Sequence, residues 1–264
     1  MLKMALFSFL LKSGIFRIRA VRTPMFRVYF ALKRRYYDIY YDLIVRRPEL
    51  FTGGFILDVG ANIGCTSTFF SDVVSPGFCV YAFESAPDNF YLLQQCIASY
   101  HRERKITAVH AAVGDHDGRT RLEINKLNPT AHRVLGPEPD SQPLATPTIE
   151  VPLISLDSFC VSHKVHPIKF VKIDVEGYEL FVCRAMTEIL ALNPEIVVGL
   201  EVGAASQSSM GYDRNQLLEF FLSRSFHLYT ARKGELQGCS IQDLDRMLES
   251  TDHVDVLASR SRLV

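Results

Sequence analysis

The chain has 264 residues, 48% of them hydrophobic and 22% charged, with a formal net charge of zero, as in an ordinary globular protein. Its length suits one large or two small domains. The six cysteines form no C-x-x-C pair, so the sequence supports neither a disulfide framework nor a zinc site, and no metal is predicted. Cysteines of this kind are compatible with the reducing cytosol, and we expect a cytoplasmic protein.

The charge is unevenly distributed along the chain. Residues 1–50 hold eleven Lys or Arg and three Asp or Glu, whereas the remainder holds 18 and 26. The apolar stretch from Met4 to Leu11 is too short to span a bilayer, and no signal-peptide cleavage site follows it. A transit peptide stays open as an alternative, because the start is basic and contains no acidic residue.

Residues 26–47 predict a helix, because Tyr29, Leu32, Tyr36 and Leu43 recur at a helical spacing. We therefore interpret residues 1–50 as a basic N-terminal helical extension. Two interpretations of its role are open. The helix packs across a sheet and exposes a basic face to solvent, or it contacts a membrane surface or a partner protein through residues 1–47.

From Phe55 onward, strands alternate with helices, which predicts parallel pairing and a layered α/β domain over residues 51–264. The expected strands are 55–59, 78–83, 105–113, 168–174 and 195–201, and the helices between them are 63–74, 87–100 and 178–192. Asp213 is expected to cap a helix that runs to Ser223. Residues 226–230 and 254–258 are predicted to form an antiparallel pair at one edge.

Residues 119–161 interrupt this alternation. The pattern predicts strands over 119–125 and 149–153 and a short helix over 156–161. Between the two strands, residues 126–148 contain five prolines and little periodicity. Loops of this length are functional or disordered, and we interpret residues 126–148 as a lid over the substrate, with plain disorder as the alternative.

The segment FILDVGANIG at 55–64 predicts a strand, a tight turn and a helix. Gly60 and Gly64 allow backbone torsions and close approaches that a Cβ atom would block. A dinucleotide site would need G-x-G-x-x-G, with a pyrophosphate at the helix N-terminus. Asp58 inside the strand would repel a pyrophosphate but suits a cationic, phosphate-free ligand such as S-adenosylmethionine. An ordinary turn with chance glycines is the alternative.

Carboxylates follow the predicted parallel strands, where ligands of α/β sheets bind. They are Glu84, Asp115, Asp174, Glu176 and Glu201. Glu84 stands where an acidic residue can bind both hydroxyl groups of a ribose. Each alone could be a loop residue or a helix cap, but their agreement with the turn at 58–64 favours a site. Lys172 shares one side of its strand with Asp174, and a plain ion pair is the alternative there.

Together these segments resemble the FkbM family of S-adenosylmethionine-dependent methyltransferases. They are DVGANIG at 58–64, FE at 83–84, AAVGD at 111–115, LD at 156–157 and KIDVEGYE at 172–179. The resemblance covers residues 50–260. It implies the class I methyltransferase (Rossmann-like) fold, a seven-stranded, mostly parallel sheet of order 3-2-1-4-5-7-6 with an antiparallel last strand. It also implies methyl transfer to oxygen, often on a sugar or secondary metabolite.

The resemblance also implies roles for individual residues. Asp58, Gly60, Asn62 and Gly64 would lie along the methionine and ribose parts of the cofactor, Glu84 would bind the ribose, and Asp115 would lie near the adenine. Asp174 and Glu176 would face the reacting end, and we expect one of them to be the general base. His132 and His166 are alternative bases, and a metal bound by Asp174, Glu176 and Glu201 is a further alternative. Ser85 and Tyr178 depart from the family pattern.

Two other functions stay open. One is a NAD-dependent oxidoreductase on a doubly wound sheet, against which Asp58 and the glycine spacing argue. The other is a non-catalytic, membrane-apposed adaptor of the same fold. A nucleic-acid partner has only the basic N-terminal segment in its favour. The sequence names neither the methyl acceptor, which we expect to be a glycan or small molecule, nor the oligomeric state.

Overall fold

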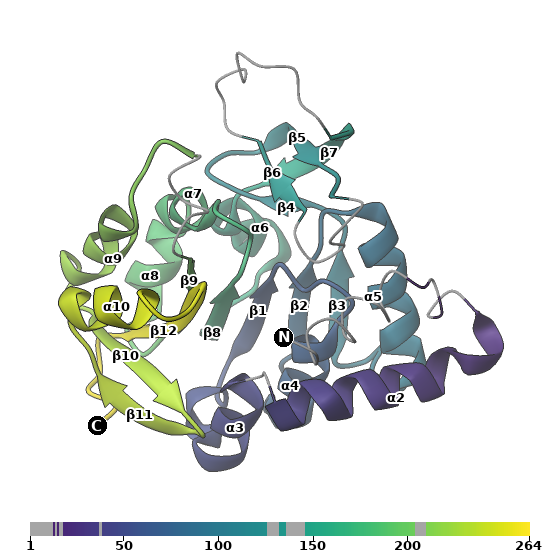
Figure 1. Cartoon of the computed structure of the whole chain (residues 1–264), viewed down its shortest axis with the longest axis horizontal. Helices are drawn as coiled ribbons and strands as arrows, with labels where there is room; N and C mark the ends of the chain where they lie inside the picture. The colour runs from purple at the N-terminus through teal and green to yellow at the C-terminus, as the bar shows by residue number, and fades with distance from the viewer. Residues whose placement is uncertain are drawn as a thin grey trace.

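The computed structural model describes residues 13, 15, 18–36, 39–125, 132–135, 146–203 and 210–264. Its main sheet has eight strands in the order β11-β10-β12-β9-β8-β1-β2-β3 (Figure 1). These are β1 (Phe55–Val59), β2 (Val80–Phe83), β3 (Ile106–Val109), β8 (Ile168–Ile173), β9 (Val197–Gly203), β10 (His227–Arg232), β11 (Glu235–Gly238) and β12 (His253–Ser259).

The strand directions match the expected class I methyltransferase sheet. Strands β3, β2, β1, β8 and β9 pair in parallel, and β12 runs antiparallel to both β9 and β10. The expected order 3-2-1-4-5-7-6 with an antiparallel last strand is therefore confirmed. Strand β11 extends the sheet beyond β10, so the expected edge pair is not at the edge.

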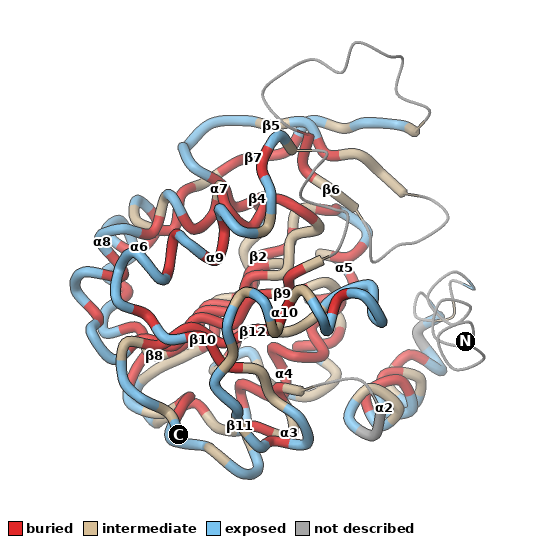
Figure 2. The backbone as a smooth tube through the Cα atoms, turned by 60° about the vertical axis from the view of Figure 1, so that its left-hand side comes forward, coloured by how far each residue is buried: buried red, intermediate tan, exposed pale blue. Residues whose placement is uncertain are grey.

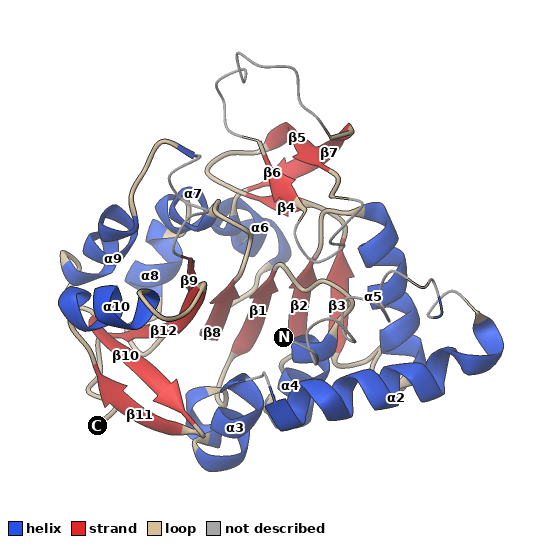
Figure 3. Ribbon diagram, viewed as in Figure 1, coloured by secondary structure: helices blue, strands red, loops and turns tan. Residues whose placement is uncertain are grey.

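Helices cover both faces of the sheet (Figure 3). One face packs against α3 (Ile39–Arg46), α4 (Cys65–Val73) and α5 (Pro87–Ser99), and the other against α6 (Leu156–His163), α7 (Glu179–Arg184), α8 (Thr187–Leu192), α9 (Arg214–Leu222) and α10 (Ile241–Leu248). Successive residues of the central strands alternate between these cores: Ile56 and Phe170 face α3–α5, whereas Leu57 and Val171 face α6–α10. The inner strands are therefore mostly apolar, with Asp58 and Lys172 as buried charged exceptions, and form the buried centre seen in Figure 2.

The N-terminal extension packs onto the α/β domain. It forms two helices, α2 (Arg19–Tyr36) and α3, so the single helix expected over 26–47 is wrong in extent. The apolar face of α2 presents Phe26, Tyr29 and Phe30, each at most 3% exposed, to a cluster that includes Ile63 and Phe69. Within the part of the chain that the structure describes, no helix has the length and apolarity needed to cross a bilayer.

A second, small sheet lies above the carboxyl ends of β1–β3 (Figure 1). Its order is β4-β7-β5-β6, with β4 (Ala112–Val113), β5 (Gly118–Glu123), β6 (Arg133–Val134) and β7 (Thr148–Ile154). The expected hairpin is present as β5 and β7, but the single strand expected over 105–113 is wrong, because Ala112 pairs with Leu153 in this second sheet. The lid expected over 126–148 lies largely outside the described residues.

Two further differences have local causes. The helix expected over 178–192 is divided into α7 and α8, because Asp157 on α6 caps α8 by accepting hydrogen bonds from the amides of Glu188 (3.0 Å) and Ile189 (2.9 Å). Strand β11 and helix α10 were not expected. A turn at Lys233 and Gly234, both with positive φ, connects β10 to β11. The expected cap at Asp213 is present as a capping box.

Candidate active site

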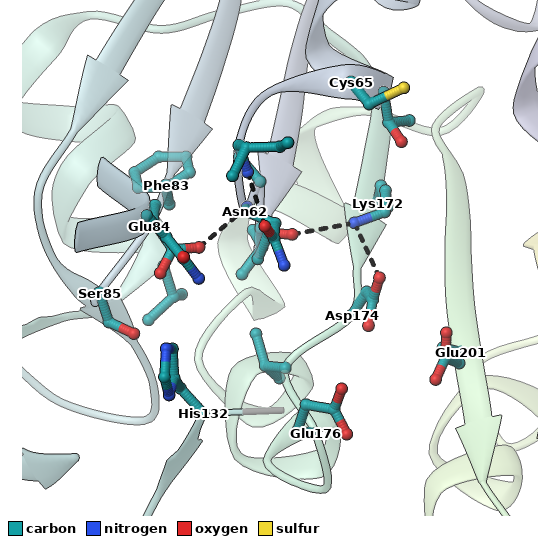
Figure 4. Close-up of a pocket in the computed structure, with 18 of the residues that line it drawn as sticks. Asn62, Cys65, Phe83, Glu84, Ser85, His132, Lys172, Asp174, Glu176 and Glu201 are labelled. Atoms are coloured by element: carbon teal, nitrogen blue, oxygen red, sulfur yellow. Dashed lines mark hydrogen bonds and ion pairs between the residues drawn. The ribbon is translucent and has the colours of Figure 1, made fainter. Parts of the chain in front are cut away.

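A cavity of about 520 Å³ opens at the carboxyl ends of the parallel strands, a volume typical of small-molecule sites. Figure 4 shows lining side chains from the ends of β2 and β8, from the loops after β1, β2 and β8, and from β9, together with Cys65 at the start of α4 and His132 before β6. The carboxylates that line it are Glu84, Asp174, Glu176, Glu201, Asp252 and Asp255, and the lysines are Lys33 and Lys172. Among the described residues, the cavity is therefore predominantly acidic.

The turn after β1 depends on two glycines. Gly60 has φ +79°, and a Cβ atom there would lie 1.8 Å from the backbone oxygen of Asp174. Gly64 has φ +87°, and its Cβ would lie 2.6 Å from Leu93 of α5. Gly60 thus lets the β1 turn approach the end of β8, and Gly64 lets α4 begin close to α5. Both glycines set the shape of the site through close approaches within the protein.

Glu84 connects the loops after β1 and β2. Its carboxylate accepts hydrogen bonds from the backbone amides of Asn62 (2.9 Å) and Ala86 (2.8 Å). Burial raises the pKa of Glu84 to about 7, although these two hydrogen bonds act in the opposite direction. Each carboxylate oxygen has accepting capacity left for a ligand hydroxyl.

A buried ion cluster lies at the centre of the site. The ammonium of Lys172 is 3.2 Å from Asp58 and 3.2 Å from Asp174, and it donates a hydrogen bond to the carbonyl of Gly60 at 3.2 Å. Burial disfavours the charge of Lys172, but Asp174 and Asp58 outweigh it, so that the pKa is raised. The hydroxyl of Ser67 donates to the other oxygen of Asp58. Lys172 therefore ties the end of β8 to β1.

The loop after β8 presents Glu176 to the cavity. Glu176 has φ +55°, and the loop around it is held by Glu179, whose carboxylate accepts from the amides of Val175 (3.3 Å) and Gly177 (3.0 Å) and from the hydroxyl of Tyr212 (3.1 Å). Burial, followed by the charges of Asp174 and Glu179, raises the pKa of Glu176 to about 7.

The cavity contains only part of the predicted site. Of the predicted site residues, Gly60, Asn62, Glu84, Asp174 and Glu176 line the cavity, whereas Asp58, Gly64 and Asp115 do not. Of the two residues that depart from the family pattern, Ser85 lines the cavity and Tyr178 does not. Asp58 is fully buried beneath Lys172. Asp115 is exposed and contacts His116 at 2.7 Å. His166 precedes β8, at the opposite end of that strand from Asp174. The cofactor roles of these residues stay predictions.

Other lining residues were not assigned to the site from the sequence. Asp255 lies directly opposite Glu201 in the antiparallel pair β9–β12, so this carboxylate pair depends on strand register. Burial, followed by Asp174 and Asp255, raises the pKa of Glu201. Lys33 and Tyr29 of α2 also line the cavity. The spacing of four residues between Tyr29 and Lys33 indicates a helix, but it does not indicate that these side chains line a ligand site.

No group of three His, Cys, Asp or Glu side chains among the described residues is arranged to hold a metal ion. A model of the Methyltransferase FkbM domain matches residues 58–228, more than half of the chain. The chain belongs to the FkbM methyltransferase family. A search of curated proteins finds no match.

Solved structures with a similar fold include other methyltransferases. One is precorrin-6Y C5,15-methyltransferase from Geobacter metallireducens, at 12% identity and a TM-score of 0.45, covering 89% of this chain and 88% of that one. Another is an O-methyltransferase from Bacillus cereus in complex with SAH, at 12% identity and a TM-score of 0.47, where the match covers 84% of this chain and 79% of that one. A third is the O-methyltransferase TomG from Streptomyces achromogenes in complex with SAM, at 11% identity and a TM-score of 0.45, where the match covers 84% of this chain and 78% of that one.

The cavity fits the chemistry of S-adenosylmethionine, the cofactor that the resemblance to this family implies. The carboxylate of Glu84 faces the cavity with accepting capacity for ribose hydroxyls, and the acidic lining suits a ligand that carries an ammonium and a sulfonium. Asn62 and Glu84, on neighbouring loops, would hold the ribose side. The same lining would repel the pyrophosphate of a dinucleotide.

The ion cluster predicts a large loss of stability when Lys172 is replaced. Lys172→Met leaves the fully buried Asp58 without its counter-charge, which should lower the free energy of unfolding by about 3–5 kcal/mol. The control is Lys169→Met on the same strand, because its partner Glu195 is 80% exposed and the loss should not exceed about 1 kcal/mol. Urea unfolding measures both, and equal small losses would contradict the structural role of the cluster.

We expect the substitution Glu176→Gln to stabilise the folded protein in a pH-dependent way. Its pKa rises from an ordinary value of 4.5 to about 7 on folding, so this group makes the folded protein progressively less stable as pH increases from 4.5 to 7. Glu176→Gln removes this penalty and should be more stable than the parent protein by about 1–3 kcal/mol at pH 8. The difference should disappear below pH 4.5.

Thermal or urea unfolding across this pH range measures the effect. Glu150→Gln is the control, since the ion pair of Glu150 with Arg119 leaves both side chains more than half exposed, at 61% and 58%. A Glu176→Gln variant that is no more stable than its parent at pH 8 would show that the burial of Glu176 carries no cost.

Proposed function

We propose that the chain is an S-adenosylmethionine-dependent O-methyltransferase that acts on a hydroxyl group of a sugar, glycan or small metabolite. The observation that carries this proposal is Glu176, a carboxyl group with a pKa of about 7 in the cavity at the end of β8. A general base is most effective when its pKa lies near the operating pH. Hydroxyl groups need such a base, because they are weak nucleophiles while protonated.

Geometry favours Glu176 over the other candidate bases. Asp174 is already paired with the ammonium of Lys172 at 3.2 Å, which suits it to orienting a hydroxyl group rather than to taking its proton. The Nδ1 atom of His132 accepts a hydrogen bond from the amide of Asn125 at 3.1 Å, so Nε2 carries the proton of the neutral ring. Burial also lowers the pKa of His132. His132 therefore faces the cavity as a donor.

Each side chain has a distinct part in the proposed reaction. When bound, S-adenosylmethionine supplies a methyl group on a positively charged sulfur. Glu176 takes the proton of the acceptor hydroxyl, and Asp174 holds that hydroxyl in line with the methyl group. Alignment of this kind can contribute about 7–11 kcal/mol, and general-base catalysis adds about 10²–10⁴-fold.

The remaining carboxylates support a polyhydroxylated acceptor. Glu201 and Asp255 lie opposite each other at the end of β9 and also line the cavity. Carboxylates accept hydrogen bonds from hydroxyl groups at several positions, so an acceptor with neighbouring hydroxyls would satisfy both. A sugar offers such neighbouring donors, whereas an acceptor with a single phenol does not.

Transfer of a radiolabelled methyl group tests the proposal. The full chain is incubated with S-adenosylmethionine labelled in its methyl group and a panel of glycans and small hydroxylated metabolites. We expect label in at least one sugar or hydroxylated metabolite as an alkali-stable ether, which separates it from an alkali-labile methyl ester. Label found only on nitrogen or carboxyl groups would contradict the proposed methylation of a hydroxyl group.

With an acceptor in hand, Glu176→Gln should lower kcat by about 10²–10⁴-fold and remove the rise of kcat with pH near 7. Glu150→Gln, at a side chain of β7 that is 61% exposed, should leave kcat unchanged. If both Glu176→Gln and Asp174→Asn keep full turnover with intact cofactor binding, the assignment of the base to this loop is wrong.

A further inference from the structure

Helices α2 and α3 form one wall of the cavity, although both precede the family match at residues 58–228. Their contribution to the lining consists of Tyr29 and Lys33 from α2 and Ile39 and Tyr40 from α3. Tyr29 and Lys33 lie one helical turn apart and therefore share a face. The extension thus completes the site with side chains that the matched domain does not supply.

Packing fixes the position of this wall. Phe26, Tyr29 and Phe30 of α2 cluster with Ile63 and Cys65, the residues on either side of Gly64 at the start of α4. The guanidinium of Arg34, next to Lys33, lies 4.4 Å from the centre of the Tyr41 ring and 5.4 Å from that of Phe69. These contacts hold the Lys33 turn of α2 beside the loop that follows β1.

Lys33 brings positive charge to a cavity whose other described ionisable lining is mainly acidic. Lys172, the second lining lysine, lies 3.2 Å from both Asp58 and Asp174. Burial lowers the pKa of Lys172, and the ammonium of Lys33 acts in the same direction. Asp174 and Asp58 outweigh both effects and raise the pKa. Both ammonium groups therefore contribute positive charge to the same cavity.

The cofactor has one anionic group, the carboxylate of its methionine part. An acidic cavity would repel this carboxylate unless a cation lay next to the position that the carboxylate occupies. The geometry points to Lys33 as the residue that binds the carboxylate of S-adenosylmethionine, with α2 acting as a built-in part of the cofactor site. This inference rests on the proposed cofactor and adds a cofactor-binding residue outside the family match.

A comparison of two ligands tests the inference without turnover. S-Adenosylhomocysteine carries the carboxylate, whereas 5′-methylthioadenosine has the same nucleoside and lacks the amino-acid part. Calorimetric titration of the full chain with Lys33→Gln should show the Kd for S-adenosylhomocysteine raised by about 10- to 100-fold, with the Kd for 5′-methylthioadenosine within about twofold of the parent value. Retained binding of the second ligand shows that the variant is folded.

Two variants serve as controls. Arg27→Gln removes the same charge from an exposed position of α2 and should leave both Kd values unchanged. Lys33→Arg keeps the charge and should restore most of the affinity for S-adenosylhomocysteine. The inference is overturned if Lys33→Gln binds S-adenosylhomocysteine as tightly as the parent, or if it loses both ligands equally.

The same titration separates this inference from the proposed function. Parent protein that binds neither ligand overturns the cofactor assignment, and the role of Lys33 with it. Parent protein that binds S-adenosylhomocysteine no more tightly than 5′-methylthioadenosine overturns the role of Lys33 alone. A Lys33→Gln variant with normal cofactor affinity but a raised KM for an anionic acceptor would assign Lys33 to the acceptor instead.

Discussion

The buried contact of Lys172 with Asp58 and Asp174 is the constraint on which the site depends. It joins adjacent strands, because Asp58 and Lys172 are register partners in the parallel pair β1–β8. Two carboxylates this close would repel each other without the ammonium between them, and burial makes such repulsion costly. The sequence motifs at 58–64 and 172–179 are thus in direct contact through Asp58 and Lys172. Asp58 lies beneath the cavity and is not part of its lining.

The rest of the site follows from this contact. The β1 turn can approach Asp174 only because residue 60 has no Cβ atom. The same turn offers the amide of Asn62 to Glu84, which fixes the position of the Glu84 carboxylate, while Glu179 fixes the loop that carries Glu176. The backbone around the cavity is therefore held by hydrogen bonds and ion pairs before a ligand arrives. Such preorganisation is what a reaction that depends on alignment requires.

Much of this architecture could be predicted from the sequence. Alternating strands and helices fix the parallel sheet, and carboxylates after successive strands must meet at one edge, so Glu84, Asp174 and Glu176 were placed together. The burial of Asp58 could not be predicted, because it depends on the register between β1 and β8. The pairing of Ala112 with β7 and the position of Lys33 beside the cavity are contacts between distant segments, for which local periodicity carries no signal.

The central claim is that an acidic cavity, organised around a buried lysine, binds the adenosyl amino-acid framework of S-adenosylmethionine and rejects phosphate-bearing cofactors. Calorimetric titration of the full chain with S-adenosylhomocysteine and, separately, with NAD tests this claim most directly. The account predicts saturable one-to-one binding of S-adenosylhomocysteine and no binding heat with NAD. Saturable binding of NAD, with none of S-adenosylhomocysteine, would contradict it.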